Sequence, residues 1–277
     1  MSLFDRALAH VESLSSGPAL DPALRVTLNF HPDRTANRVP ILAALARERV
    51  YRSQFATGTS NGGLTAYPGG DRWNWESRIF GGAYDEAEPS CRPVYGGLNF
   101  RLLPYGASPR FGSSHFRLTG ESCTRATYCY PDSAAEPADF GTARRMGLIA
   151  LASADQPRRH NLDDYIEAQL HGPVSIERDV EALVLDPCYR GTEVEVAAEL
   201  LPCAIEWHGG FRLSVEKMAE YPDFRGPEFV ELGKRIAVDG RLDPRIVGAS
   251  AATGEHDPQS LKYVWHYLAK FGAPSPS

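Results

Sequence analysis

The stretch that decides the fold is Asp163-Asp164-Tyr165-Ile166-Glu167-Ala168-Gln169-Leu170-His171-Gly172-Pro173. Successive side chains of a β-strand point to opposite faces, so one face carries three apolar side chains, those of Ile166, Ala168 and Leu170. The other face carries a phenol, a carboxylate, an amide and an imidazole, from Tyr165, Glu167, Gln169 and His171. Alternation is typical of any half-buried strand. A polar face of this composition also suits the wall of a cleft, and it makes Glu167 the candidate catalytic carboxylate.

Length and composition are those of an ordinary globular chain. The 277 residues include 43% hydrophobic and 23% charged residues, and 29 basic against 35 acidic residues give a net charge of −6. This balance argues against non-specific binding of nucleic acid through a basic surface. The first residues lack the charged and apolar regions of a signal peptide, and no apolar run approaches the roughly 18 residues of a membrane span. We therefore expect neither nucleic-acid nor membrane partners.

The residues that commonly bind metals show no metal-site spacing. The five cysteines form an odd set without CxxC pairs, which favours a reducing compartment over a disulfide scaffold: Cys91, Cys123, Cys129, Cys188 and Cys203. Four histidines are conceivable ligands, but no HExxH or other close spacing joins them: His31, His115, His171 and His208. Structural roles are therefore expected for most of these histidines, and no metal is expected.

Apolar periodicity and turn residues divide the chain into helices and strands. Helical spacing predicts helices over residues 3–14, 41–49, 75–80, 141–152, 192–200, 227–238 and 258–270. Strand patterns cover residues 26–30, 50–55, 95–103, 113–118, 123–130, 163–173 and 179–185, and residues 204–213 predict a hairpin. No repeat and no shift in composition marks a linker. We therefore expect one α+β domain over residues 1–277, with an N-terminal helical extension of about residues 1–24.

A lone arginine lies in the predicted strand Val50-Tyr51-Arg52-Ser53-Gln54-Phe55, before the turn Thr57-Gly58-Thr59-Ser60-Asn61-Gly62-Gly63. A buried arginine needs an anion, and a structural ion pair is the ordinary outcome. Backbone N–H groups of a glycine-rich turn can also cradle phosphate oxygens that an arginine binds with two hydrogen bonds. The pattern matches neither the Walker motif nor GxGxxG, so both interpretations stay open.

A further candidate segment is Arg110-Phe111-Gly112-Ser113-Ser114-His115-Phe116. Small hydroxyl residues at the start of a strand often satisfy backbone groups at the edge of a sheet. In a functional site, the same hydroxyls can brace a catalytic carboxylate or hold a ribose. The serines therefore carry both a structural and a functional interpretation.

In this order, the three segments resemble the arginine–serine–glutamate branch of the ADP-ribosyltransferase superfamily. Tyr51-Arg52, Ser113-Ser114 and Glu167 match its aromatic–arginine pair, its serine-centred strand and its catalytic glutamate. The resemblance implies an α+β fold with a split β-sheet core, flanking helices and insertions. It also implies that NAD is the co-substrate and that nicotinamide is released.

Longer motifs, spread over roughly residues 25–270, resemble a CteC-like family of bacterial effectors. These motifs are Asn29-Phe30-His31-Pro32-Asp33-Arg34, Tyr51-Arg52-Ser53-Gln54-Phe55, Ser60-Asn61-Gly62-Gly63, Arg92-Pro93-Val94-Tyr95-Gly96-Gly97, Arg110-Phe111-Gly112-Ser113, Glu167-Ala168-Gln169-Leu170-His171-Gly172 and Leu261-Lys262-Tyr263-Val264-Trp265-His266. That family is associated with ADP-ribosylating a threonine of ubiquitin. The resemblance implies a mono-ADP-ribosyltransferase, of the glycosyltransferase class, that blocks ubiquitination as an effector or toxin. It also implies a location in the bacterial cytoplasm, or delivery into a host cytosol without a cleaved signal peptide.

The resemblance further implies roles for individual residues. The catalytic set would be Glu167, Arg52 and Ser113. The set that binds NAD would be Arg52, Ser53, Gln54, Thr59, Asn61, Gly62, Ser113, Ser114 and His31. Tyr165, Gln169 and His171 would orient the acceptor. The superfamily often has Glu or Gln two residues before the catalytic glutamate, and Tyr165 at that position favours a hydroxyl acceptor over an arginine.

Other interpretations remain open at this level. Glu193-Val194-Glu195 is a literal Glu-x-Glu motif, but Thr192 before it and acidic residues in a first turn are typical of a helix start. Water as the acceptor would make the protein an NAD glycohydrolase. A transferase fold without activity would make it a protein-binding module.

Overall fold

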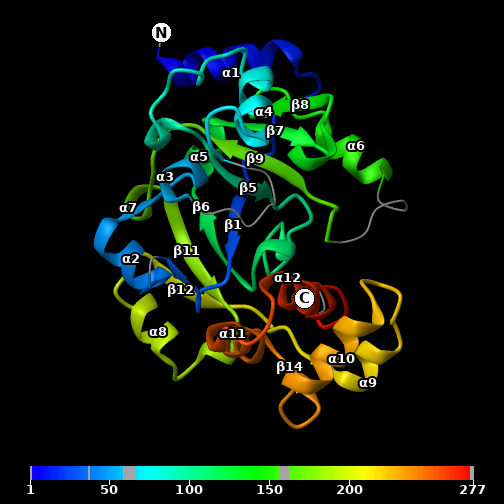
Figure 1. Cartoon of the computed structure of the whole chain (residues 1–277). Coiled ribbons are helices and arrows are strands. Elements are labelled where there is room, and N and C mark those ends of the chain that lie inside the picture. Colours follow the sequence, from blue (N-terminus) through cyan, green and yellow to red (C-terminus); the bar gives the residue numbers. More distant parts are fainter. Residues whose placement is uncertain (1, 37, 59–65, 156–161, 275–277) are drawn as a thin grey trace.

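The computed structural model describes residues 2–36, 38–58, 66–155 and 162–274, and its centre is an eight-stranded sheet (Figure 1). The order of the strands across this sheet is β12-β11-β6-β1-β5-β9-β7-β8. Their bounds are β1 Val26–Phe30, β5 Val94–Leu98, β6 Ser114–Leu118, β7 Ala126–Tyr130, β8 Asp139–Thr142, β9 Ile166–Leu170, β11 Val180–Leu185 and β12 Ala204–Trp207. The β11–β12 pair is parallel, and the other pairs in this sheet are antiparallel. The chain therefore has the expected α+β fold.

Short ladders and helices surround the sheet. The ladders pair β2 Thr35–Ala36 with β3 Val39–Pro40, β4 Val50–Tyr51 with β10 Val174–Ser175, and β13 Leu213–Ser214 with β14 Arg241–Leu242. The α-helices are α1 Leu3–Leu14, α2 Ile41–Glu48, α3 Gln54–Thr57, α4 Asp71–Ile79, α5 Gly120–Thr124, α6 Leu148–Asp155, α7 Ile176–Asp179, α8 Glu193–Ala198, α9 Val215–Ala219, α10 Pro227–Ile236, α11 Pro244–Thr253 and α12 Pro258–Phe271. Short 3-10 helices are η1 Pro89–Cys91, η2 Pro109–Phe111, η3 Ser133–Ala135 and η5 Pro187–Tyr189.

The two faces of the sheet differ in chemistry because the side chains alternate along each strand. One face supplies the largest apolar cluster, with members such as Leu28, Phe116 and Ala168. The other face carries polar side chains that are also buried, among them Asn29, His115, Glu167 and Gln169. Buried polar groups need hydrogen-bond partners, so this second face is where the sheet must supply a network.

The sheet narrows to a short junction between β1 and β5. Only the pairs Val26–Leu98 and Thr27–Gly97 join these strands, whereas five pairs join β5 to β9. A Cβ atom on Gly97 would lie 2.9 Å from Cβ of Ala107, so only glycine allows the loop to pack this closely. The junction joins one half, β12-β11-β6-β1, to a second half, β5-β9-β7-β8. The two halves nevertheless belong to one continuous sheet, with helices around it.

Two further apolar clusters complete the packing. One contains Cys129 of β7 with side chains of α1 and α4, such as Val11 and Trp75, and Tyr84 from the turn after α4. The other is formed mainly by the helices from α9 to α12 and includes Trp265 and Tyr267. Figure 1 shows α1 and α4 beside the β9-β7-β8 end of the sheet, and the C-terminal helices at the opposite end of the molecule. Within the described ranges, no helix is both long and apolar enough to cross a membrane.

Several predicted elements agree with the structure and others are wrong. Helix α1 and strand β1 have the predicted bounds. The predicted strand 50–55 ends at Tyr51, because the Ser53 side chain accepts a hydrogen bond from the backbone N–H of Ala56 and starts α3. The predicted hairpin 204–213 does not form, since β12 pairs in parallel with β11 instead. The predicted helix 141–152 begins only at Leu148, after β8.

Candidate functional site

The carboxylate of Glu167 is held on the buried polar face. Strand β9 lies between β5 and β7, where Glu167 pairs with Gly97 and Cys129. The side chain is almost enclosed, since the residue is 6% exposed. Its Oε2 atom accepts hydrogen bonds from Oγ and backbone N of Ser133, at 2.9 and 3.3 Å. Its Oε1 atom accepts a hydrogen bond from Nε2 of Gln169 at 3.1 Å. The carboxylate therefore has a defined orientation.

A chain of buried hydrogen bonds runs from Glu167 along the polar face. The Thr127 hydroxyl donates to Oε1 of Gln169 at 2.8 Å, so it must accept from Nε2 of His171, 3.0 Å away. The other ring nitrogen, Nδ1, then accepts from the Tyr84 hydroxyl at 2.6 Å. Each donor meets one acceptor, which assigns His171 to the tautomer with the proton on Nε2. Gln169 thus holds Glu167 directly, and His171 holds Gln169 through Thr127.

The protonation states follow from burial. Burial raises the pKa of Glu167 above its usual range, and the nearby Arg72 guanidinium opposes that rise. Burial also lowers the pKa of His171 to about 3, so the imidazole is neutral at physiological pH. A neutral His171 is what the hydrogen-bond chain requires, because one of its nitrogens must accept.

Tyr165 lies directly before β9, and its side chain also has fixed partners. Its hydroxyl donates to Oδ2 of Asp132 at 2.6 Å, and its ring meets Phe111 edge-on with centroids 5.8 Å apart. Asp132 and Ser133 both follow β7, so one turn positions the partners of Tyr165 and of Glu167. The sequence analysis did not select Ser133, and its place in the turn that follows a predicted strand is only a weak signal.

Helix α4 adds buried charges beside the carboxylate. The Arg72 guanidinium stacks on the Tyr95 ring, with its central carbon 3.9 Å from the ring centroid. The Tyr95 hydroxyl donates to Oε1 of Glu76 at 2.7 Å, and Arg92 donates to Oε2 of Glu76 at 2.7 Å. Glu76 and Arg92 form a buried ion pair, with side chains 0% and 4% exposed. The sequence analysis assigned a role to none of the four residues, although Arg92 and Tyr95 lie in one of the motifs that carry the resemblance.

Arg52 does not contact this network in the structure. Its side chain is 49% exposed, and its Nε donates to Oε2 of Glu48 at 2.6 Å. Ser53 donates its hydroxyl proton to the carbonyl of Pro89, and Gln54 is the first residue of α3. The structural ion pair is thus the interpretation of Arg52 that the geometry supports. The predicted NAD contacts Thr59, Asn61 and Gly62 lie outside the described residues.

The predicted serines lie in the other half of the sheet. The Ser113 carbonyl accepts a hydrogen bond from Nε2 of His208 at 2.7 Å, and the Ser114 hydroxyl accepts one from the backbone N–H of Asp186 at 3.2 Å. His31 follows β1 and meets Trp265 edge-on, with centroids 4.7 Å apart. Strand β6 is three strand spacings, or roughly 14 Å, from β9. No contact among the described residues brings Ser113 to Glu167.

The remaining sequence alternatives also have structural outcomes. Glu193 and Glu195 lie in the first turn of α8, whose N-cap is Thr192, so the predicted helix start is confirmed. Within the ranges that the structure describes, no three His, Cys, Asp or Glu side chains are grouped to hold a metal ion. The five cysteines named above are free thiols.

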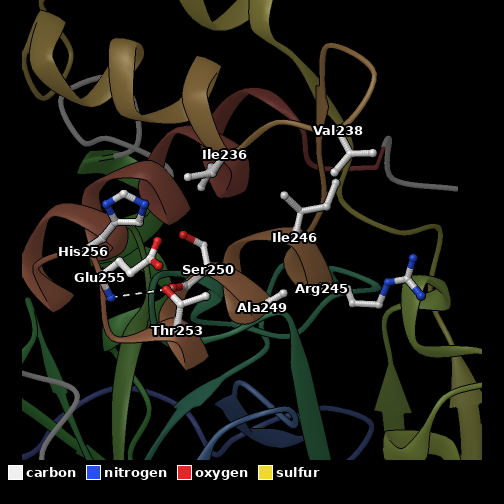
Figure 2. Close-up of a pocket in the computed structure, with 9 residues that line it drawn as sticks. All are labelled: Ile236, Val238, Arg245, Ile246, Ala249, Ser250, Thr253, Glu255 and His256. Atoms are coloured by element: carbon white, nitrogen blue, oxygen red, sulfur yellow. Dashed lines mark hydrogen bonds between the residues drawn. The ribbon is translucent and has the colours of Figure 1, made fainter.

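A surface groove lies apart from Glu167, along α11 (Figure 2). Its volume is about 570 Å³, and its lining is largely apolar with a few polar groups: Ile236, Val238, Arg245, Ile246, Ala249, Ser250, Thr253, Glu255 and His256. None of the residues selected from the sequence lines this groove. The candidate site is therefore the network around Glu167.

Cutting the hydrogen-bond chain at its centre should cost stability. Thr127→Val keeps the shape of the side chain but removes the hydroxyl. Oε1 of Gln169 and Nε2 of His171 then lack the hydrogen-bond partner that this hydroxyl provides. We expect the free energy of unfolding to fall by about 1–3 kcal/mol, measured by urea unfolding. Thr124→Val, at an exposed threonine of α5, is the matched control and should change it by less than about 0.5 kcal/mol. Equal effects of the two substitutions would contradict the network.

Comparison with known proteins places the chain in a family. No functionally curated protein matches the sequence. Two segments, residues 25–154 and 148–271, match the model of a family described as "Protein of unknown function (DUF3626)". Together they span most of the chain, including β9 and its neighbours. The protein therefore belongs to the DUF3626 family.

Proposed function

We propose that the protein transfers ADP-ribose from NAD to a hydroxyl group of an acceptor protein, with Glu167 as the catalytic carboxylate. The observation that carries this proposal is the fixed, buried carboxylate of Glu167, bound by Ser133 and Gln169. A carboxylate in such a site is a preorganised negative charge, which stabilises a developing cation more than a solvated carboxylate does. The narrow β1–β5 junction and the sequence motifs that carry the resemblance add support.

The proposed reaction is a substitution at the anomeric carbon of the ribose. The bond between C1′ and the nicotinamide nitrogen breaks, and its electron pair leaves with the nicotinamide. The acceptor oxygen forms the new bond to C1′ and loses its proton to a base. The transition state resembles an oxocarbenium ion, as in glycoside hydrolysis. Nicotinamide and an O-linked ADP-ribosyl group are the products.

Glu167 has the capacity for this role. Ser133 supplies two donors to Oε2, whereas Oε1 receives Nε2 of Gln169 and the weak thiol donor of Cys129, whose Sγ is 3.9 Å away. A ribose hydroxyl that donates to Oε1 would replace only the thiol and leave the bonds from Ser133 and Gln169 in place. Because Glu167 is 6% exposed, the residues that cover it must move to admit a substrate.

For the acceptor, we propose a threonine of ubiquitin. This rests on the resemblance of the motifs to the CteC-like effectors and on Tyr165, which occupies the place of a second carboxylate. An effector acting in a host cytosol is the corresponding biological role. Tyr165 is bound to Asp132. Tyr165 therefore favours a hydroxyl acceptor because position 165 itself carries no carboxylate, and the nearby negative charge of Asp132 is engaged by the Tyr165 hydroxyl.

The test is incubation with isotope-labelled NAD and ubiquitin, followed by mass-spectrometric mapping of the modified residue. We expect a mass increase of one ADP-ribosyl unit on a threonine. Labelling of another protein would remove ubiquitin as the substrate. Release of free ADP-ribose at the same rate with and without protein would identify a glycohydrolase instead. Absence of any NAD turnover would contradict the proposed function.

A further inference from the structure

Arg72 is a buried arginine with two guanidinium nitrogens, Nε and Nη1, that have no hydrogen-bond partner among the described residues. The residue is 3% exposed, and both of these atoms are buried. An arginine side chain carries five N–H donors, and a buried donor without an acceptor is costly. Native proteins keep few such groups, so each one calls for an explanation.

The neighbouring Arg92 shows what a structural arginine looks like in the same environment. It is 4% exposed, its Nη1 donates to Oε2 of Glu76 at 2.7 Å, and its Nη2 donates to the Tyr84 carbonyl at 2.8 Å. Both of these guanidinium nitrogens therefore have acceptors. The two arginines are equally buried, but Nε and Nη1 of Arg72 have no acceptor among the described residues. This difference indicates that Arg72 has a role other than structural ion pairing.

The position of Arg72 is nevertheless defined. Its guanidinium lies over the Tyr95 ring at 3.9 Å, and Tyr95 is itself held by its hydrogen bond to Glu76. The charges of Arg72 and Glu167 interact, but Glu167 takes its hydrogen bonds from Ser133 and Gln169. The N–H groups of Arg72 are thus preorganised beside the carboxylate and available for an oxyanion.

We infer that Arg72 binds the pyrophosphate of the dinucleotide through paired hydrogen bonds from its guanidinium. This inference rests on the proposed function. Two N–H groups of one guanidinium match two oxygens of a phosphate, which makes such pairs stronger than a single ionic contact. The inference assigns to Arg72 the role that the sequence had suggested for Arg52, whose Nε is bound to Glu48.

The experiment compares two ligands by isothermal titration calorimetry. ADP-ribose contains the pyrophosphate, whereas nicotinamide riboside contains the ribose and nicotinamide but no phosphate. In Arg72→Met, which keeps an unbranched side chain over Tyr95, we expect ADP-ribose to bind about 10- to 100-fold more weakly. Nicotinamide riboside should bind as it does to the unchanged protein. Arg72→Lys keeps the positive charge but not the paired N–H groups of the guanidinium. This variant should lose an intermediate amount of affinity for ADP-ribose.

Arg78→Met is the matched control, because Arg78 is an exposed arginine of the same helix and should leave both affinities unchanged. Thermal unfolding of each variant checks that the fold is kept. Unchanged ADP-ribose binding in Arg72→Met, or an equal loss for both ligands, would overturn the inference while leaving the proposed function standing. An unchanged protein that binds neither ligand would overturn the proposed function as well.

Discussion

Replacement of Glu167 by glutamine should lower the rate of ADP-ribose transfer by at least about a hundred-fold, because the substitution removes the negative charge that faces the developing cation. The amide is nearly isosteric with the carboxylate, so the strand and its apolar face stay in place. The rate is measured with labelled NAD and acceptor protein, under conditions in which the variant is folded by circular dichroism.

The matched control is Glu195→Gln, in the Glu-x-Glu stretch of α8. This residue lies in a helical first turn, and its carboxylate accepts a hydrogen bond from the backbone N–H of Gly191. We expect the control to transfer at the unchanged rate. Loss of activity in Glu195→Gln with full activity in Glu167→Gln would move the catalytic site to α8.

The acid limb of the pH profile should report the environment of Glu167. Burial raises the pKa of this carboxyl group, and catalysis requires the ionised form. The rate should therefore fall, as the pH is lowered, at a higher pH than an ordinary glutamate would give. The free energy of unfolding depends on pH in the opposite direction. Because the folded-state pKa of Glu167 is raised, the protein loses stability as the pH rises and this group ionises.

Removal of the buried partner of Glu76 should produce the largest loss of stability. In Arg92→Met, Glu76 loses a hydrogen bond and an opposite charge while it remains fully buried. Breaking a buried ion pair from one side costs about 3–5 kcal/mol, because the remaining charge is uncompensated. Urea unfolding at pH 8 measures this cost. A loss below about 1 kcal/mol would show that the pair contributes little.

The pH dependence of this loss has a definite sign. Burial raises the pKa of Glu76 to about 6 even with Arg92 present, which acts to lower it. Without Arg92 the pKa should rise further. Since a raised pKa means that stability is lost as the pH rises through it, the variant should be closer to the unchanged protein at pH 5 than at pH 8. Arg144→Met, which removes an exposed guanidinium 3.7 Å from Glu12, should change stability by less than about 1 kcal/mol at either pH.

Local sequence patterns predicted those elements whose causes lie within a few residues. Apolar alternation over residues 166–170 predicted β9, and Thr192 followed by acidic residues predicted the start of α8. The same reasoning failed at residues 50–55, because the pattern of apolar residues did not reveal that Ser53 caps a helix. In that segment a single side-chain hydrogen bond outweighs the strand propensity of its neighbours.

The surroundings of Glu167 could not be predicted from local patterns. Its partner Ser133 is 34 residues away in the sequence, and the Tyr84–His171 link spans 87 residues. Likewise, Tyr95 lies on a sheet strand and Arg72 on a helix, and only packing stacks one on the other. The periodic spacing of apolar residues along the sequence does not predict such contacts.

The sequence by itself determined that Glu167 lies in a strand with one apolar and one polar face. The tertiary structure decided that this polar face is buried, that Gln169 and His171 support the carboxylate, and that Arg72 lies beside it while Arg52 pairs with Glu48. The physical reason is that alternation follows from backbone geometry within one segment. The environment of a charge, by contrast, depends on side chains that distant segments bring together and on the water that they exclude.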